Sequence, residues 1–231
     1  MTERPPESPP ESPPEALPGS PASSPGATAD ALFRDHAVFR LVHNRFYRVS
    51  PRLFRSGQPT PAQLRRWTRR HGLKTVINLR GRHPHATYGQ EIAACRALGL
   101  VHIDFRIESR GAPGKDRMLQ LLDMAEGLDY PVLAHCKTGA DRAGLFAAAF
   151  LHGVEDRPIG LAQRQLGLRY GHWRQAKTGI LDLFFEHYVR DTGGRGFRRW
   201  LEEDYDPAAL KADFMSRWWA TVLVDRILRR E

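Results

Sequence analysis

The chain of 231 residues has few cysteines, few lysines and no long hydrophobic run. Its two cysteines, Cys95 and Cys136, are too few for a disulfide framework. No apolar stretch approaches the roughly 18 residues that cross a bilayer. The N-terminus also lacks the apolar core of a secretory signal. These absences exclude a disulfide-rich domain and a membrane-spanning protein, and we expect a cytoplasmic protein.

The charge is strongly positive and unevenly distributed. The formal net charge is +9, and 30 of the 35 basic residues are arginine. Residues 1–30 carry five acidic side chains and one arginine, a balance of −4, which leaves +13 on residues 31–231. A body this basic predicts an anionic partner, such as a phosphate, a nucleic acid or an acidic membrane. An arginine-rich solvated surface explains the same numbers without any partner.

Composition divides the chain into three parts. Residues 1–30 hold nine of the 17 prolines and repeat the phrase Pro-Pro-Glu-Ser. Such a segment cannot bury enough apolar surface to offset its ordering entropy, so we predict a disordered, acidic, proline-rich tail. We expect a globular domain over residues 31–192 and a helical C-terminal extension over residues 193–231 that packs on it.

Apolar patterning predicts alternating strands and helices in the first part of the domain. The expected strands cover 46–49, 52–56, 75–79, 101–105 and 131–135, and the expected helices cover 61–71, 91–98, 117–128 and 143–151. This alternation predicts an α/β fold in three layers, with a central, mostly parallel sheet of four to five strands flanked by helices. Further helices are expected over 158–170, 178–190, 197–203 and 207–229.

One short stretch combines residues that suit phosphate chemistry. Cys136 directly follows the predicted buried strand 131–135, and Arg142 opens the next predicted helix, with Gly139 between them. The spacing of cysteine and arginine is a weak signal in so arginine-rich a chain. The strand–loop–helix setting is the stronger signal, because ligands bind at the carboxyl ends of parallel strands.

The loop predicts covalent catalysis through a cysteine. Loop amides and a helix N-terminus form an anion-binding nest, and the helix dipole with Arg142 favours the thiolate of Cys136. That thiolate can attack phosphorus and form a phosphocysteine, which water then hydrolyses. Because amides and Arg142 stabilise the charge, this chemistry requires no metal or other cofactor. The alternative is an inert buried cysteine beside a surface arginine.

The segment His135-Cys136-x5-Arg142 resembles the signature loop of the cysteine-dependent protein tyrosine phosphatase superfamily, in the form of its compact atypical dual-specificity branch of bacterial type. Residues 55–59 and 75–80 also resemble segments of bacterial and plant–fungal atypical members, and the resemblance covers about residues 45–190. It implies a three-layer phosphatase fold with Cys136 as nucleophile and Arg142 as phosphate clamp. It further implies a loop that binds phosphate through His135, Lys137, Thr138, Gly139 and Ala140.

Two departures from the family pattern concern turnover. Ala143 stands where members carry a serine or threonine whose hydroxyl helps the thiolate leave, so the phosphoenzyme is expected to hydrolyse slowly. The loop that usually supplies an aspartic acid as proton donor contains none before Asp116. Three carboxylates therefore compete for this role: Asp141, whose place resembles that in myotubularin and Sac-type lipid phosphatases, Glu108 on the movable loop, and Asp116.

The resemblance implies metal-independent hydrolysis of phosphomonoesters, with protein phosphotyrosine or phosphoserine/threonine as the usual substrate. A lipid or inositol phosphate is the alternative that Lys137 and Asp141 favour, and RNA 5′-triphosphatases share the loop. A non-catalytic phosphate-binding module and a rhodanese-like sulfurtransferase also stay open. Arg80 and Arg82 are expected to be exposed side chains, with substrate contact as the alternative. His83 and His85 are not expected to bind metal, although a zinc site is the alternative. Cys95 and Asp104 are expected to have structural roles. Trp218 and Trp219 are expected to pack against the domain, with peripheral binding to an acidic membrane as the alternative.

Overall fold

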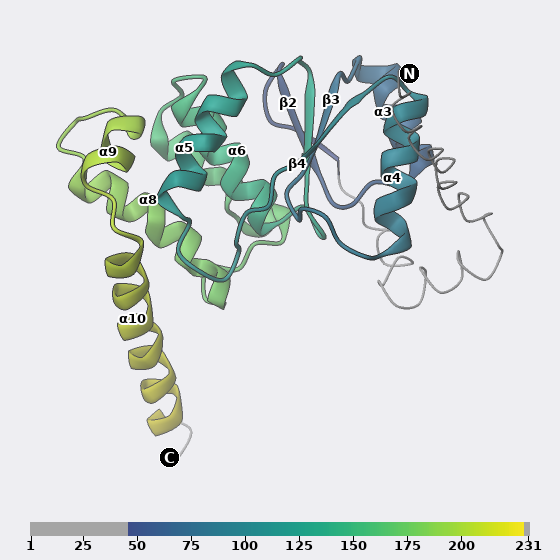
Figure 1. Ribbon diagram of the computed structural model, residues 1–231. Helices are drawn as coiled ribbons and strands as arrows, with labels where there is room; N and C mark the ends of the chain where they lie inside the picture. The colour runs from purple at the N-terminus through teal and green to yellow at the C-terminus, as the bar shows by residue number, and fades with distance from the viewer. Residues whose placement is uncertain (1–45, 229–231) are drawn as a thin grey trace, which may run out of the picture.

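The computed structural model describes residues 46–228, and for the last nine of these the backbone alone. The acidic tail predicted for residues 1–30 and the first residues of the predicted domain lie outside the described residues. Within the described range the chain forms a three-layer α/β fold, as predicted, followed by a helical segment that ends in one long helix (Figure 1).

Five strands form the central sheet, in the order β1-β2-β5-β3-β4. They are β1 (Tyr47–Arg48), β2 (Leu53–Ser56), β3 (Thr75–Asn78), β4 (Val101–Asp104) and β5 (Val132–His135). Only β1 pairs antiparallel; the other neighbours are parallel. In the register, His135 at the end of β5 lies between Ser56 of β2 and Asn78 of β3. The loops that follow these three strands therefore start at one edge of the sheet.

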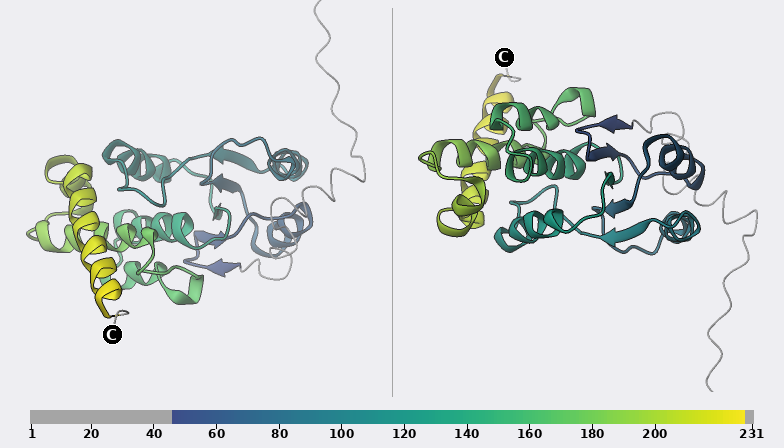
Figure 2. Two further views of the ribbon diagram at one scale, coloured as in Figure 1. Left: turned by 90° about the horizontal axis from the view of Figure 1, so that it is seen from below. Right: turned by 90° about the horizontal axis from the view of Figure 1, so that it is seen from above.

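Helices cover both faces of the sheet (Figure 2). The helices α3 (Pro61–His71) and α4 (Ala86–Ala97) lie on one face, and α5 (Lys115–Glu126) and α6 (Asp141–Gly153) lie on the other. Each face has its own hydrophobic cluster: Trp67 and Leu133 belong to the first, while Phe146 and Met118 belong to the second. The second cluster is larger because the C-terminal helices add to it.

The described C-terminal segment consists of three short 3-10 turns and four further α-helices. These are α7 (Ile159–Ala162), η1 (Gln163–Gln165), η2 (Leu168–Tyr170), η3 (Lys177–Gly179), α8 (Ile180–Asp191), α9 (Phe197–Glu203) and α10 (Pro207–Leu228). α8 and α9 bury aromatic residues against the α6 side, among them Phe184 and Trp200. α10 contacts α8 and then extends away from the body (Figure 1).

Two expected elements differ from the structure. α4 begins at Ala86, whereas the sequence predicted a loop to Tyr88 and a helix from Glu91. The early start was missed because His85 precedes the helix without a side-chain cap. The single helix expected over 158–170 is broken instead into α7 and two 3-10 turns. The break occurs where Gly167 is extended and the Gln165 carbonyl accepts a hydrogen bond from Arg55.

The hydrophobic stripe of α10 packs at its beginning only. Leu210 is fully buried and Phe214 packs against the core, but Trp219 is 59% exposed. Trp218 is half-buried and lies near Lys177 of the α8 side. No helix among the described residues is long and apolar enough to cross a membrane.

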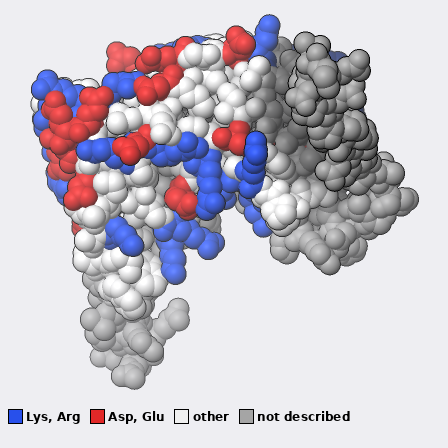
Figure 3. All heavy atoms as spheres, viewed as in Figure 1, with Lys and Arg blue, Asp and Glu red and all other residues white. Residues whose placement is uncertain are grey.

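Many arginines of the C-terminal segment are paired with acidic neighbours. Arg198 lies 2.7 Å from Asp123, and Arg195 lies 3.0 Å from Asp204. Figure 3 shows acidic and basic side chains intermixed over the α9 end of this face, with mostly basic side chains nearer its middle. Pairing therefore accounts locally for part of the arginine content.

The capping box of α3 provides a test of the local sequence rules. The Thr60 side chain accepts a hydrogen bond from the Gln63 amide, and the Gln63 side chain accepts one from the Thr60 amide. We predict that Thr60→Ala lowers the free energy of unfolding by about 1 kcal/mol in urea titrations, because it leaves a helix N-H without a partner. Thr60→Ser should retain wild-type stability, and equal losses in both variants would contradict this role of the cap.

Candidate active site

The Cys136–Arg142 loop joins β5 to α6 at the carboxyl edge of the sheet. Cys136 is 2% exposed, and the amide of Gly139 donates a hydrogen bond to its sulfur over 3.2 Å. α6 starts at Asp141, so the positive end of its dipole belongs to the same loop. Both features stabilise negative charge on sulfur, which is the reactive form of a cysteine.

Gly139 is required by the packing of the loop against β2. Its φ of +79° lies in the left-handed region, and a Cβ there would stand 2.6 Å from the carbonyl carbon of Ser56. The close approach that the structure shows is thus to the β2 backbone. Any other residue at this place would be strained and would also collide with main-chain atoms.

The Arg55 side chain donates hydrogen bonds to the backbone of the Cys136–Arg142 loop. Its side chain is fully buried, and its Nη2 donates to the carbonyls of Gly139 and Ala140 over 2.6 and 2.8 Å. In a trans peptide the carbonyl and the following N-H point in opposite directions. The amides of Ala140 and Asp141 are therefore turned away from Arg55, as an anion cradle formed by this loop requires.

Both terminal nitrogens of the buried Arg55 guanidinium have hydrogen-bond partners. Its Nη1 donates to the carbonyl and the side-chain oxygen of Gln165, and its guanidinium stacks 4.2 Å from the Tyr170 ring centroid. Burial lowers the pKa of Arg55 to about 10, partly offset by the nearby Cys136. The group is thus a buried cation at neutral pH, placed close to the sulfur.

His135 is held by a buried carboxylate. Its Nε2 lies 2.7 Å from Oε1 of Glu91, which also bonds His102 over 3.0 Å and accepts a hydrogen bond from Gln58. Burial alone would raise the pKa of Glu91, but the charge of His135 and the hydrogen bonds from His102 and His135 bring it to about 2. Glu91 is therefore an ionised group on the α4 side that fixes the residue before Cys136.

The other predicted phosphate-binding residues all lie on the loop. Arg142 is half-buried in the first turn of α6, and Lys137 is half-buried beside Cys136. Thr138 is exposed, whereas Ala140 is buried. The loop thus presents a cation at each end.

Asp141 is bonded to a histidine that the sequence did not single out. Its Oδ1 lies 2.7 Å from Nδ1 of His172, and Nε2 of His172 lies 2.7 Å from Oδ2 of Asp182. Burial alone would lower the pKa of His172, but the hydrogen bonds with the two carboxylates raise it to about 9. Asp141 therefore lies beside a positively charged imidazole.

The two other candidate carboxylates stand apart from this chain of hydrogen bonds. The Glu108 side chain is 62% exposed and pairs with Arg106 over 3.1 Å. Asp116 is an exposed residue in the first turn of α5, whose N-cap is Gly114. Neither is joined to the Cys136 loop by a hydrogen bond that the structure describes.

The residues for which we expected structural roles make mainly structural contacts. Asp104 accepts hydrogen bonds from Asn78 and Tyr88. Cys95 is 1% exposed in the α3–α4 cluster, where burial raises its pKa to about 12. The rings of His83 and His85 are 5.1 Å apart. No group of three or more candidate metal ligands occurs among the described residues.

The sequence did not predict the side chains of other elements that hydrogen-bond to the loop and to His135. Glu91 carried a detectable signal, because it is a charged residue on the face of a helix that also buries Ala94 and Cys95. His172 and Asp182 gave none, since they lie 31 and 41 residues after Asp141 and meet it through a break that was predicted to be helix.

The parallel sheet, the buried cysteine and the arginine six residues later define a phosphatase domain of the dual-specificity and tyrosine-phosphatase class. The family model described as "DSP-PTPase phosphatase fused to NAD+ Kinase" matches residues 44–168. This match spans more than half of the chain, which therefore belongs to that family.

Curated relatives carry the same class name. The dual specificity protein phosphatase TpbA of Pseudomonas aeruginosa is 38% identical over 124 residues in strain PAO1 and 37% identical in strain UCBPP-PA14. The alignments cover 52% of this chain and 53% of each relative, so the chain spans about half the length of the curated relatives it matches. A crystal structure of a TpbA variant with pTyr has a TM-score of 0.52 and 22% identity, and covers 70% of this chain and 92% of that chain, which supports the fold.

The Glu91 cluster predicts a stability change that depends on pH. The pKa of Glu91 falls from 4.5 to about 2 in the folded protein, so its contribution is complete above about pH 4.5 and is lost as pH falls toward 2. We predict that Glu91→Gln lowers the free energy of unfolding by about 3 kcal/mol at pH 7, because two histidines lose a buried partner. The difference from wild type should shrink below pH 4.5, as measured by urea denaturation.

A matched control is Glu126→Gln, which removes a carboxylate that is 71% exposed. Exposed ion pairs contribute little, so this variant should remain within about 0.5 kcal/mol of wild type. Equal losses in the two variants, or a loss at Glu91 that does not change with pH, would argue against a buried ionised carboxylate.

Proposed function

We propose that the protein is a metal-independent phosphatase that hydrolyses phosphomonoesters through a phosphocysteine on Cys136. The observation that carries this proposal is the hydrogen bond from the Gly139 amide to the buried Cys136 sulfur, in a loop that leads into a helix N-terminus. This arrangement supports a thiolate, and a thiolate is the nucleophile that the reaction needs.

The first step is an in-line displacement. The Cys136 sulfur attacks phosphorus, an S–P bond forms, and the ester O–P bond breaks with its electron pair on the leaving oxygen, which takes a proton from water. Arg142 holds two phosphate oxygens through its guanidinium, and the loop amides hold the third. These groups supply the charge stabilisation, so the proposal requires no metal ion.

In the second step, water attacks the phosphocysteine. The new O–P bond forms, the S–P bond breaks, and the electron pair returns to Cys136 as thiolate while a base takes the water proton. Ala143 is fully buried in α6 and has no hydroxyl to donate to the leaving sulfur. The second step therefore depends more on a base here, and we propose that it is the slower one.

Phosphotyrosine in a protein is the substrate we favour. The curated relatives are named dual specificity protein phosphatases, and one solved TpbA structure contains pTyr. Trp173 directly follows His172 and is 62% exposed, and we propose that its ring stacks on an aromatic leaving group. A lipid or inositol phosphate is the second candidate, because the exposed Trp219 on α10 and the loop residue Lys137 suit an anionic lipid surface.

The nucleophile is tested with p-nitrophenyl phosphate in the presence of EDTA. We predict turnover that vanadate inhibits and that Cys136→Ser reduces at least about 10³-fold, because the covalent step is lost. Cys95→Ser is the control, since Cys95 is a packing thiol on the other face of the sheet. EDTA-sensitive turnover that survives in Cys136→Ser would contradict the mechanism, and binding of phosphate without any turnover would indicate a non-catalytic module. Turnover of thiosulfate instead would indicate a sulfurtransferase.

The substrate class is tested with a panel at fixed ionic strength. We expect the highest kcat/KM for phosphotyrosine peptides, because they combine a phosphomonoester with a ring for Trp173. The comparison measures phosphate release from phosphotyrosine and phosphoserine peptides, phosphoinositide vesicles and 5′-triphosphate RNA. A higher kcat/KM on vesicles would favour the lipid phosphatase, and Trp173→Ala should lower kcat/KM for phosphotyrosine peptides selectively.

A further inference from the structure

His172 is a buried histidine with a carboxylate on each ring nitrogen. Its side chain is 1% exposed, and each nitrogen lies 2.7 Å from an aspartate oxygen. Asp141 belongs to the Cys136 loop and begins α6, while Asp182 lies in the first turn of α8. The imidazole thus joins the loop to the C-terminal helices.

The geometry determines the protonation state of the ring. An ionised carboxylate only accepts hydrogen bonds, so a ring that bonds two of them must donate from both nitrogens, which requires an imidazolium. The raised pKa of about 9 agrees with this reading. Among the described residues, the charged groups that face the ring are Asp141 from α6 and Asp182 from α8. Arg174 and Glu186 pair with each other beyond Asp182.

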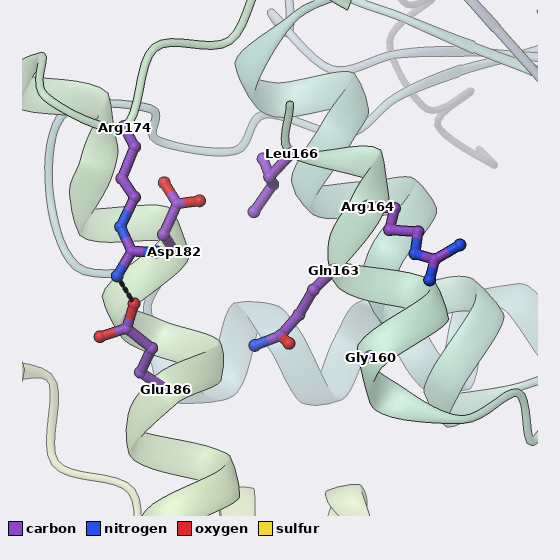
Figure 4. A pocket seen from close by; sticks show the side chains of 7 residues that line it. All are labelled: Gly160, Gln163, Arg164, Leu166, Arg174, Asp182 and Glu186. Carbon is purple, nitrogen blue, oxygen red and sulfur yellow. Dashed lines mark hydrogen bonds and ion pairs between the residues drawn. The ribbon is translucent and has the colours of Figure 1, made fainter. Parts of the chain in front are cut away.

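Asp182 also lines a cavity of about 330 Å³ (Figure 4). The Figure shows Arg174 reaching Glu186 on the same side as Asp182, with the Gln163 side chain opposite. The Asp182 side chain is 15% exposed, so the outer end of this chain of hydrogen bonds lies near solvent. The inner end is Asp141, whose side chain is 26% exposed at the loop.

The hydrogen bond from the imidazolium fixes the orientation of the Asp141 carboxyl group. Oδ1 of Asp141 accepts the hydrogen bond from His172, which leaves Oδ2 to accept another proton. A carboxylate held in this way is suited to remove a proton from water and poorly suited to donate one to a leaving group. This favours a base in the second step over the proton-donor role predicted for Asp141 from sequence.

We propose that His172 is a positioning residue that holds Asp141 as the base for hydrolysis of the phosphocysteine. This inference rests on the proposed function. Water attacks phosphorus, its proton passes to Oδ2 of Asp141, the S–P bond breaks, and its electron pair restores the Cys136 thiolate. Asp141 then releases the proton to solvent. His172 and Asp182 both follow residue 168, so the C-terminal segment beyond the family match completes the site.

The test compares steady-state and pre-steady-state turnover of p-nitrophenyl phosphate. In His172→Gln we expect kcat to fall by about 10²-fold, with KM falling along with it because the slowed second step follows phosphoenzyme formation. The burst of nitrophenolate that a slower second step gives in wild type should increase in amplitude in His172→Gln, because the second step becomes slower still. In wild type, kcat should fall as pH rises through about 9, where His172 deprotonates. His172→Gln should lack this basic limb of the pH–rate profile. Asp182→Asn should move the limb to lower pH, because one of the two hydrogen bonds that raise the pKa of His172 is gone.

The matched control is His187→Gln. His187 is 7% exposed on the same helix α8 and bonds Asp213 of α10 over 2.8 Å, away from the loop. This variant should lose stability but keep the kcat, the burst amplitude and the pH dependence of wild type.

If His172→Gln and Asp182→Asn behave like His187→Gln in rate, burst and pH limb, the positioning role is overturned. If His172→Gln does not fold, the displaced limb in Asp182→Asn decides, because that variant keeps the imidazole. These outcomes differ from a failure of the proposed function, in which wild type itself would show no Cys136-dependent turnover.

Discussion

The hydrogen bonds from Arg55 to the carbonyls of Gly139 and Ala140 are the interaction on which the site depends. A loop that gathers backbone amides around one point must turn its carbonyls elsewhere, and buried carbonyls need donors. Arg55 supplies those donors from the end of β2, and Gly139 allows the approach because it lacks a Cβ. The loop is thus shaped before any anion arrives, and little reorganisation is needed at the moment of reaction.

Three buried charged side chains lie around this edge of the sheet, and each has several polar partners. Arg55 has carbonyls and an aromatic face, Glu91 has two histidines and an amide, and His172 has two carboxylates. An unpaired charge in such a place would be very costly, whereas a paired one with all its hydrogen bonds made fixes a single geometry. Polar partners on three sides therefore hold the loop around Cys136, whose own side chain belongs to the larger apolar cluster.

Most of the fold could be predicted from the sequence because its signals are local. Thr60, Pro61 and Gly72 delimit α3, and the apolar run at 132–135 is typical of a central parallel strand. The Cys136 loop could be recognised for the same reason, since nucleophile and arginine lie on one turn of chain. The supports could not be predicted, because Glu91 and His172 reach the loop across the sheet and through an irregular turn. Their spacing carries no period, so only the three-dimensional structure brings them together.

The placement of the two cysteines has a consequence for redox chemistry. Cys95 packs between α3 and α4, whereas Cys136 belongs to the cluster on the opposite face, so the sheet separates the two sulfurs. Among the described residues, an oxidised Cys136 therefore has no second thiol on its side of the sheet with which to form a disulfide. Peroxide would therefore leave Cys136 as a sulfenic acid, and its recovery would require a thiol from another molecule.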